Sequence, residues 1–313
     1  MNNKSKAVVV TPLYKETLSD NEVISFIQLV HVLKNWPLVF VCPENLDLTY
    51  YQQFLNDKDL NITFLRLPAV FFKDVEAYNR LMYQKSFYKK FINYEYMLIY
   101  QLDCLVFSDE LSYWCDQGYS YIGAPWLRGN KFTGVAGNGG FSLRKVDDII
   151  AAIECYLSKR NKILNLIYKI NQIKLTPHAS FYELLKKTIF LGLTWVYLKT
   201  SKMYEFRKKY KNTNEDIFFV RYVPMFYKQF NIAKPKVALR FSFEKSPRFL
   251  YKINKNKLPF GCHAWQVFDL EFWKEQCPAL FVKFSDNQNL TAEDSSIDTV
   301  SLYQVATEAV STK

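Results

Sequence analysis

The stretch from Tyr96 to Phe107 constrains the fold more than any other part of the chain. It reads Tyr-Met-Leu-Ile-Tyr-Gln-Leu-Asp-Cys-Leu-Val-Phe. Such a nearly continuous run of apolar, aromatic and β-branched residues is typical of a strand buried in the middle of a sheet. Asp103 interrupts the run, and Gln101 stands two positions earlier, so both side chains would point to the same face of the strand.

A carboxylate in a buried strand must be paired, hydrogen-bonded or bound to a cation. We therefore expect the strand to break or bend at Asp103. Two interpretations stay open from this stretch alone. Asp103 either caps the next element, or it is a metal or substrate ligand at the carboxyl end of a strand, where open α/β sheets place their ligands.

Strands and helices alternate before this stretch. Hydrophobic periodicity predicts strands at residues 7–10, 38–41 and 62–67, and helices at residues 21–33, 48–55 and 75–91. The alternation predicts an α/β fold with a mostly parallel central sheet flanked by helices. A single domain over residues 1–284 accommodates these elements.

Beyond Asp103 the pattern is less regular. A strand is predicted at 119–122, a loop at 127–136, helices at 147–157 and from Asn214 to Phe219, and a further strand at 236–241. Between them lies Gly137-Asn-Gly-Gly140, whose three glycines allow another group to approach the backbone closely. A plain tight turn would have the same composition.

Two segments fall outside this pattern. Residues 158–211 form a predicted basic helical insertion, in which the apolar run 188–198 is too short to span a bilayer and is flanked by lysines. Either an amphipathic helix that touches an anionic membrane or a helix packed on the core would look like this. Residues 285–313 are rich in Ser, Thr, Asn, Asp and Glu, which predicts a disordered tail.

The charge and cysteine content narrow the class of protein. A net charge of +11 favours anionic partners, but no zinc finger, basic zipper or RNA-recognition signature is present, so nucleic acid is not expected. No apolar signal segment is visible at the N-terminus, and the six cysteines have no CxxC spacing. We expect a cytoplasmic protein, either soluble or peripheral on the inner face of the membrane. With three histidines in the chain, any metal should be a hard one with oxygen ligands and at most one imidazole.

Several motifs occur in a consistent order along the chain: Tyr100-Gln-Leu-Asp-Cys-Leu-Val-Phe107, Tyr121-Ile-Gly-Ala-Pro-Trp126, Gly137-Asn-Gly-Gly-Phe-Ser-Leu-Arg144, Asn214-Glu-Asp216 and Leu258-Pro-Phe-Gly-Cys-His-Ala-Trp265. Through them the sequence resembles glycosyltransferases of the GT-A (Rossmann-like) fold, in particular the fringe-like and β-1,3-galactosyltransferase-like branch. More closely, it is similar to a bacterial family carried as a domain of unknown function with a predicted glycosyltransferase role. The resemblance covers roughly residues 7–273.

The resemblance implies roles for five residues. Asp103 corresponds to the last Asp of the Asp-x-Asp motif, which usually binds a divalent metal, here expected to be Mn²⁺ or Mg²⁺, and Gln101 replaces the first Asp. His263 corresponds to the histidine that completes the metal site. Asp216 corresponds to the general base of inverting members, with Glu215 as the alternate.

The same resemblance, with the residue chemistry, suggests a wider set of donor- or acceptor-binding residues. Arginines could assist phosphates or be solvated charges, and tryptophans could stack on a sugar or fill the core. The candidates are Thr11, Arg80, Gln101, Trp126, Gly137, Asn138, Gly139, Gly140, Arg144 and Trp265.

The implied function is metal-dependent transfer of a sugar from a nucleotide-sugar donor, UDP-sugar being the first choice, to a glycan or lipid-linked acceptor, with inversion. A leaving nucleoside diphosphate needs a cation, and an acceptor hydroxyl needs a carboxylate base. Two alternatives stay open: a nucleotidyltransferase on a similar sheet, and a non-catalytic sugar- or membrane-binding module.

Overall fold

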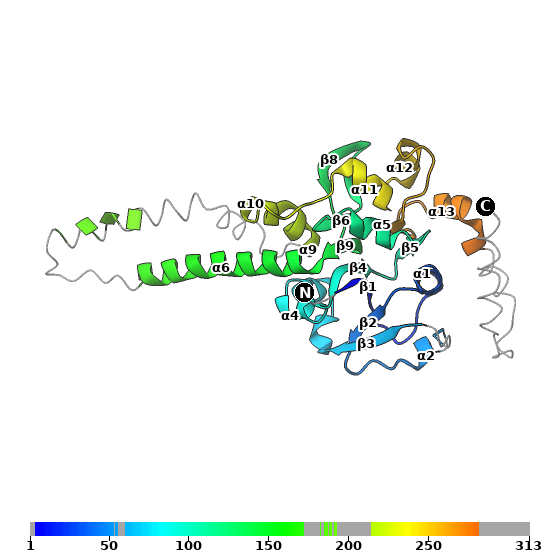
Figure 1. Cartoon of the computed structure of the whole chain (residues 1–313), viewed down its shortest axis with the longest axis horizontal. Helices are drawn as coiled ribbons and strands as arrows, with labels where there is room; N and C mark the ends of the chain where they lie inside the picture. Colours follow the sequence, from blue (N-terminus) through cyan, green and yellow to red (C-terminus); the bar gives the residue numbers. More distant parts are fainter. Residues whose placement is uncertain are drawn as a thin grey trace.

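The computed structural model describes residues 4–52, 54–55, 60–171 and 214–281, together with isolated residues between 182 and 192 (Figure 1). A six-stranded sheet forms its centre. From one edge to the other its strands are β3 (Ile62–Leu67), β2 (Leu38–Pro43), β1 (Ser5–Pro12), β4 (Tyr94–Tyr100), β9 (Phe141–Lys145) and β6 (Tyr121–Gly123). The strands β1 to β4 pair in parallel, and β9 runs antiparallel to both of its neighbours. The predicted α/β class with a mostly parallel sheet is confirmed.

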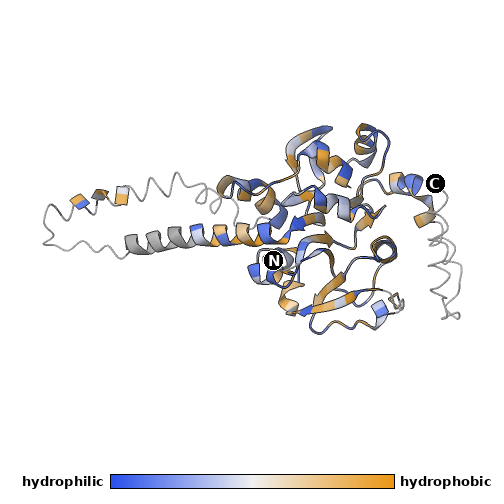
Figure 2. Ribbon diagram, viewed as in Figure 1, coloured by the Kyte–Doolittle hydropathy of each residue, from blue (hydrophilic) through white to orange (hydrophobic). Residues whose placement is uncertain are grey.

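Helices cover both faces of this sheet. One face carries α1 (Asp20–Val32), α2 (Thr49–Gln52), α5 (Leu111–Asp116) and α11 (Pro235–Phe241). The other carries α3 (Val75–Met82), α4 (Lys85–Lys89), the start of α6 (Val146–Asn171), α9 (Glu215–Ile217), the π-helical turn η2 (Phe218–Tyr222) and α10 (Val223–Phe226). Alternate residues of β1 supply the two layers: Ala7 and Val9 pack on the first face, Val8 and Val10 on the second. The apolar colour of the central strands in Figure 2 follows from burial on both faces.

The predicted break in the Tyr96–Phe107 stretch is confirmed. Strand β4 ends at Tyr100, and β5 (Cys104–Val106) leaves the main sheet to join a second sheet with β11 (Gly261–His263) and β10 (Ser242–Phe243). Between the two strands the chain turns, with the Cys104 amide donating to the Gln101 carbonyl at 3.0 Å. The helices α12 (Pro247–Ile253) and α13 (Leu270–Gln276) pack on this second sheet through a third apolar cluster.

Three sequence-based assignments are wrong. The single helix expected at 75–91 is the pair α3 and α4, because the chain turns at Tyr83 and Gln84. Residues 127–136, expected as a loop, form a hairpin of β7 (Pro125–Arg128) and β8 (Lys131–Ala136). The hairpin is largely exposed and has no apolar run, so a burial pattern could not reveal it. Residues 236–241, expected as a strand, form α11. Its apolar residues alternate as in a strand, but Pro235 stands in the first helical turn, where proline favours helix.

The predicted insertion and tail lie mainly outside the described residues. Helix α6 continues past the expected end at residue 157 to Asn171 and projects from the body of the protein in Figure 1. Seven of the eleven residues of the apolar run at 188–198, and the whole tail at 285–313, lie outside the described residues. Within the described part, no helix combines the length and apolar character needed to cross a membrane.

Candidate active site

The break after β4 places Asp103 next to His263. Antiparallel pairing of β5 with β11 sets His263 opposite Cys104, one residue from Asp103. Oδ2 of Asp103 lies 3.3 Å from Nε2 of His263, and Nδ1 of the same ring lies 3.4 Å from Oε1 of Glu244. Asn138 then donates from Nδ2 to Glu244 at 2.9 Å. The imidazole is thus held between two carboxylates.

The two carboxylates control the charge of the imidazole. Burial by itself lowers the pKa of His263, but hydrogen bonds and charge from Asp103 and Glu244 outweigh it and raise the pKa to about 10. At neutral pH the ring is therefore an imidazolium that neutralises two nearby acids. A cation that replaces the proton on Nε2 would meet the Asp103 carboxylate, while Glu244 accepts from Nδ1 on the other side of the ring.

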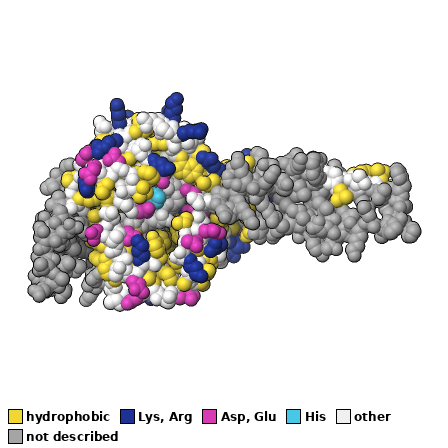
Figure 3. Space-filling model, turned by 180° about the vertical axis from the view of Figure 1, so that it is seen from behind, with side chains coloured by type: hydrophobic (Ala, Val, Ile, Leu, Met, Phe, Trp, Pro, Cys, Tyr) yellow, Lys and Arg dark blue, Asp and Glu magenta, His cyan; other side chains and the backbone are white. Residues whose placement is uncertain are grey.

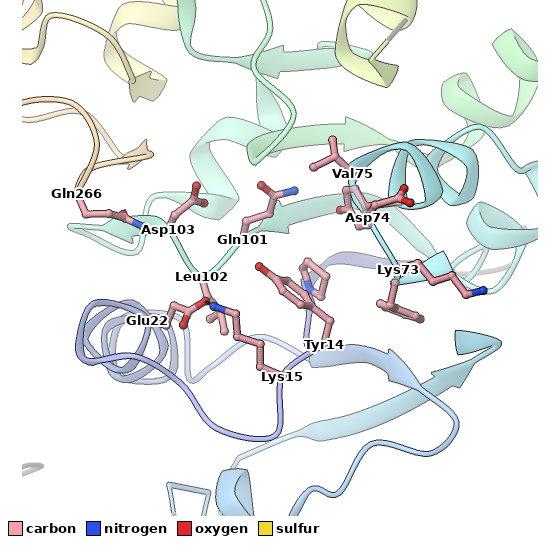
Figure 4. Close-up of a pocket in the computed structure, with 13 residues that line it drawn as sticks. Tyr14, Lys15, Glu22, Lys73, Asp74, Val75, Gln101, Leu102, Asp103 and Gln266 are labelled. Atoms are coloured by element: carbon pink, nitrogen blue, oxygen red, sulfur yellow. Dashed lines mark hydrogen bonds and ion pairs between the residues drawn. The ribbon is translucent and has the colours of Figure 1, made fainter. Parts of the chain in front are cut away.

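A cavity of about 520 Å³ opens in front of Asp103 (Figure 4). It lies at the carboxyl ends of β1 and β4, the edge at which parallel sheets bind ligands. Its lining is contributed by the loop after β1, the start of α3, the turn after β4 and the segment after β11: Pro12, Tyr14, Lys15, Glu22, Phe72, Lys73, Asp74, Val75, Tyr78, Gln101, Leu102, Asp103 and Gln266. A cavity of this size, with aromatic walls and a few polar groups, suits a small organic ligand.

Two buried oxygens at this edge have no hydrogen-bond partner within the described residues. They are Oγ1 of Thr11, next to the cavity residue Pro12, and Oε1 of Gln266, which lines the cavity. Figure 4 shows the Gln266 side chain beside Asp103. Since a buried polar atom without a partner costs free energy, the Gln266 oxygen is available to a ligand bound in the cavity, whereas Thr11 is not part of the lining.

The glycine turn separates this cluster from the acidic pair of α9. A methyl group on Gly140 would collide with the His263 ring and lie 2.8 Å from Oε1 of Gln101. A methyl group on Gly139 would collide with the Glu215 carboxylate, and one on Gly137 with Val220. The absence of side chains therefore lets the backbone pass between the imidazole and the acidic pair. The turn is more than a plain reversal of the chain.

Substitution of Gly140 by alanine tests this packing. We expect Gly140→Ala to displace the His263 ring and to lower the free energy of unfolding by about 1–3 kcal/mol through overpacking. Gly118→Ala is the matched control, because Gly118 has a φ of 71° but open space around its Cβ, so only a backbone cost of about 1 kcal/mol applies. Chemical denaturation measures both. Equal losses in the two variants would contradict the packing argument.

Glu215 and Arg144 form a buried ion pair behind the glycine turn. Nη2 of Arg144 lies 2.8 Å from Oε1 of Glu215, and the arginine side chain is fully buried. The remaining donors are also used: Nε donates to Ser142, Nη1 to the Tyr88 hydroxyl and Nη2 to the Gly139 carbonyl. The structure therefore does not support a phosphate-binding role for Arg144 or a base role for Glu215, because each is already committed to the other.

Breaking this pair should be costly. Arg144→Met leaves the Glu215 carboxylate buried without its partner, and we expect a loss of about 3–5 kcal/mol in the free energy of unfolding. Arg80→Met is the control, since Arg80 pairs with Glu76 at 3.1 Å on an exposed helix face, where such pairs contribute about 0.5 kcal/mol. Urea unfolding measures the two losses. A double variant, Arg144→Met with Glu215→Gln, should recover part of the loss, and additive losses would contradict the pairing.

Asp216 has a different environment from its neighbour. Only one protein hydrogen bond to its carboxylate is seen within the described residues, from the Ile217 amide to Oδ1 at 2.6 Å. Burial and the charge of Glu215 raise the pKa of Asp216 to about 7, and the charge of Glu244 adds to the rise. A carboxylate with a pKa near neutrality suits a general base.

Three further predicted residues do not face the cavity. Arg80 lies on an exposed face of α3 and pairs with Glu76. Trp265 is fully buried and donates from Nε1 to Ser25, so it fills the core and cannot stack on a sugar. Trp126 is half-buried with Arg221 over its ring at 5.2 Å, outside the cavity lining. Asn138 is buried too, and its Oδ1 accepts from the Gly140 amide at 2.7 Å, which holds the turn in place.

Sequence reasoning missed several residues of the site. Glu244 follows a two-residue strand that no periodicity reveals. Tyr14 and Lys15 lie in the loop after the first strand, and Tyr78 lies on α3. The position of Pro12 at a strand end could have drawn attention to Tyr14 and Lys15, because loops after strand ends line ligand sites in such sheets.

The residues at this site fit a divalent cation shared with a ligand. Within the described ranges, no group of three His, Cys, Asp or Glu side chains is placed to hold a metal alone. Asp103 and His263 offer one carboxylate and one imidazole nitrogen 3.3 Å apart, and Glu244 can fix the ring by accepting from Nδ1, as carboxylates behind metal-binding histidines do. A metal with two protein ligands needs further oxygens from substrate phosphates and water, as is usual for Mg²⁺.

Comparison with known proteins identifies the family. Residues 61–263 match a family model described as a protein of unknown function, DUF5672, and the chain belongs to that family. No curated protein matches the chain by sequence. The matched span begins one residue before β3, ends at His263, and so includes both Asp103 and His263.

Solved structures give weaker likenesses. The glycosyltransferase GlyE of Streptococcus pneumoniae TIGR4 is 12% identical with a TM-score of 0.42, over 87% of this chain and 60% of GlyE. A glycosyltransferase involved in glycosylation of the major capsid of PBCV-1 is 9% identical with a TM-score of 0.37, over 85% of this chain and 96% of that one. Core-mannan synthase A from Aspergillus fumigatus, in a Mn/GDP form, is 13% identical with a TM-score of 0.30, over 41% and 44%. The chain thus spans less than two thirds of GlyE. TM-scores below 0.5 establish neither a shared fold nor a shared function.

Proposed function

We propose that this protein is a GT-A-type glycosyltransferase that moves a sugar from a nucleotide-sugar donor to a glycan or lipid-linked acceptor. The observation that carries the proposal is the placement of Asp103 and His263 at the edge of a 520 Å³ cavity, at the carboxyl ends of parallel strands. The glycine turn also contacts the carboxylate of Glu215, the sequence neighbour of Asp216, whose pKa of about 7 suits a base. Cation ligands and a carboxylate with a pKa near neutrality fit a reaction with a diphosphate leaving group and a hydroxyl nucleophile.

The cavity residues would bind the donor. Tyr14 is exposed at the cavity and offers an aromatic face to a base or sugar. Lys15 and Lys73 supply positive charge for phosphates, although Lys15 also pairs with Glu22 at 2.7 Å. Among the predicted donor-binding residues, Gln101 lines the cavity, and Thr11 is the sequence neighbour of the lining residue Pro12.

Asp103 and His263 would hold a divalent metal, Mn²⁺ or Mg²⁺, together with the donor's phosphates. Such an ion supplies positive charge to the leaving nucleoside diphosphate. Glu244 would orient the imidazole. Gln101 stands where the Asp-x-Asp motif has its first acid, so the site carries less negative charge. The donor's phosphates would therefore contribute a larger share of the metal ligands.

Asp216 would remove the proton from the acceptor hydroxyl, which fits an inverting transfer. Arg144 and Glu215 act behind it. The buried pair fixes α9 against the glycine turn, and the charge of Glu215 keeps the pKa of Asp216 high. UDP-sugars remain the first choice of donor by resemblance.

The protein is proposed to act in a reducing compartment, the cytoplasm. Cys42, Cys104, Cys115, Cys155 and Cys262 are free thiols, and burial raises the pKa of Cys104 and Cys262 well above the usual range. Free, unreactive thiols are typical of cytoplasmic proteins.

A thermal-shift screen of nucleotide sugars with Mn²⁺ tests the donor. A ligand at one hundred times its Kd stabilises the folded state by about 2.7 kcal/mol, so the true donor should stand out from the rest. Release of a nucleoside diphosphate during turnover would then support sugar transfer, whereas pyrophosphate would indicate a nucleotidyltransferase. Binding without turnover across many acceptors would point to a non-catalytic module.

A further inference from the structure

A second cavity lies on another part of the surface and shares no residue with the first. Its volume is about 720 Å³, and it is bounded by α11, α12 with the turn that follows, and β8. We call it the basic groove. Its lining is Phe132, Lys236, Leu239, Arg240, Phe249, Ile253, Asn254, Lys255 and Lys257.

The four cations of the basic groove have no acidic neighbours in the lining. Lys236 and Arg240 are four residues apart on α11 and share one helix face. Within the described residues, none of these two side chains or of Lys255 and Lys257 takes part in a salt bridge. The nearby Arg248, by contrast, pairs with both Asp269 and Glu275. The positive charge of the groove is therefore not neutralised by the protein, in contrast to that of Arg248.

The turn after α12 presents two of these lysines in a fixed way. Lys255 and Asn256 have left-handed φ values of 58° and 54°, which non-glycine residues adopt at a cost. Asn254 stabilises the turn by donating from Nδ2 to the Lys257 carbonyl at 2.7 Å. Lys255 and Lys257 are both exposed on this turn.

Apolar side chains lie among the cations. Ile253 at the end of α12 is 38% exposed, and Phe249 and Phe132 are half-buried. Figure 3 shows lysine and arginine side chains projecting from the upper edge of the molecule, where Figure 1 places β8, α11 and α12. Exposed aliphatic and aromatic groups between unneutralised cations match a surface with anionic headgroups above an apolar layer.

We propose that the basic groove docks the protein on a membrane that contains anionic lipids. The cations would contact the headgroup phosphates, and Ile253 with Phe249 would reach the acyl boundary. Charge complementarity selects this partner: four cations without a counter-charge attract an anionic surface by about 1 kcal/mol each near the membrane. The docking does not depend on sugar transfer, so it can be measured without turnover.

Vesicle sedimentation with the full-length protein tests the proposal. The probes are vesicles of phosphatidylcholine alone and vesicles of two parts phosphatidylcholine to one part phosphatidylglycerol, at about 0.15 M salt. We expect binding to the anionic vesicles, weaker at higher salt. Lys255→Glu with Lys257→Glu should weaken that binding on the order of tenfold or more. Lys89→Glu with Lys90→Glu changes the net charge equally on the exposed end of α4 and should leave most of the binding intact.

A second pair of variants separates the groove from general electrostatics. Ile253→Ser should weaken vesicle binding about threefold or more, whereas Ile92→Ser, at a residue 41% exposed elsewhere, should not. Equal effects of the two lysine pairs, or full binding by the Lys255 and Lys257 double variant, would overturn the proposal and leave the groove a solvated surface. A thermal shift with inorganic phosphate alone, lost in the same double variant, together with no vesicle binding, would identify a soluble phosphate ligand instead.

Discussion

Replacement of Asp103 by asparagine is expected to lower sugar transfer by about a hundredfold to ten-thousandfold, because a metal-held charge is worth several kcal/mol to a leaving diphosphate. The variant should also lose the thermal stabilisation that Mn²⁺ with a nucleotide sugar gives the natural protein. In the natural protein the Asp103 carboxylate lies 3.3 Å from the His263 ring. The variant loses this contact but should still fold, because Glu244 remains to pair with the imidazole.

Asp109→Asn is the matched control for this experiment. Asp109 lies six residues further along, is exposed, and accepts only from the Trp36 ring nitrogen among the contacts of the described residues. Activity and metal-dependent stabilisation should both be retained in it. Full metal-dependent transfer by Asp103→Asn would show that Asp103 is not a metal ligand. Loss of transfer with unchanged stabilisation by Mn²⁺ and donor would place its role elsewhere in the reaction.

Replacement of Asp216 by asparagine is expected to lower transfer by about a hundredfold to ten-thousandfold without loss of donor binding, since a general base contributes about that much. In the natural protein the rate should fall about tenfold per pH unit below about 7, because protonated Asp216 cannot accept a proton. Glu215→Gln also lowers activity, but through the Arg144 pair, and it should lower stability as well.

Asp216→Asn should also stabilise the fold at neutral and alkaline pH. The carboxyl group has a pKa of about 3.9 in the unfolded chain and about 7 in the folded one. Between these values the folded state holds the proton more tightly, so this residue lowers the free energy of unfolding as pH rises from about 4 to about 7. Asp216→Asn removes that loss, which we place on the order of 1–3 kcal/mol because the side chain is only partly buried and solvent screens it.

Thermal unfolding at two pH values measures this effect. Asp216→Asn should have a higher Tm than the natural protein at pH about 8 and nearly the same Tm at pH about 4. A surface carboxylate such as Asp47 provides the comparison, since hydrogen bonds from Thr49 lower rather than raise its pKa. A variant that is less stable at alkaline pH would mean that ionised Asp216 is favourably paired, and the general-base assignment would then lose its physical support.

Local patterns predicted the parts of the fold whose burial is two-sided. The apolar run at 38–41 became β2, which is buried at every position, because only a strand buried on both faces is apolar throughout. Residues 62–67 became β3, an edge strand with Thr63 and Arg66 exposed. The break at Asp103 was predictable for the converse reason, since a carboxylate cannot remain inside such a strand without a partner. Where burial is one-sided or absent, as in the β7–β8 hairpin, the pattern carried too little information.

The candidate site divides in the same way. Asp103, His263 and Asp216 could be named from the sequence because motif order and a resemblance selected them. Contacts with Glu244 could not be predicted. Glu244 lies 19 residues before His263 in the chain, and only the pairing of β10 with β11 brings its carboxylate next to the His263 ring.

The sequence by itself determined the α/β class, the end of the central strand and the identity of its unusual carboxylate, because these depend on residue type and local periodicity. Tertiary structure decided which partners that carboxylate has. Charges that are far apart in sequence act on one another only when packing brings them within a few ångströms in a low-dielectric interior. That packing commits Arg144 to Glu215, buries Trp265, sets His263 between two acids, and leaves Asp216 with a raised pKa.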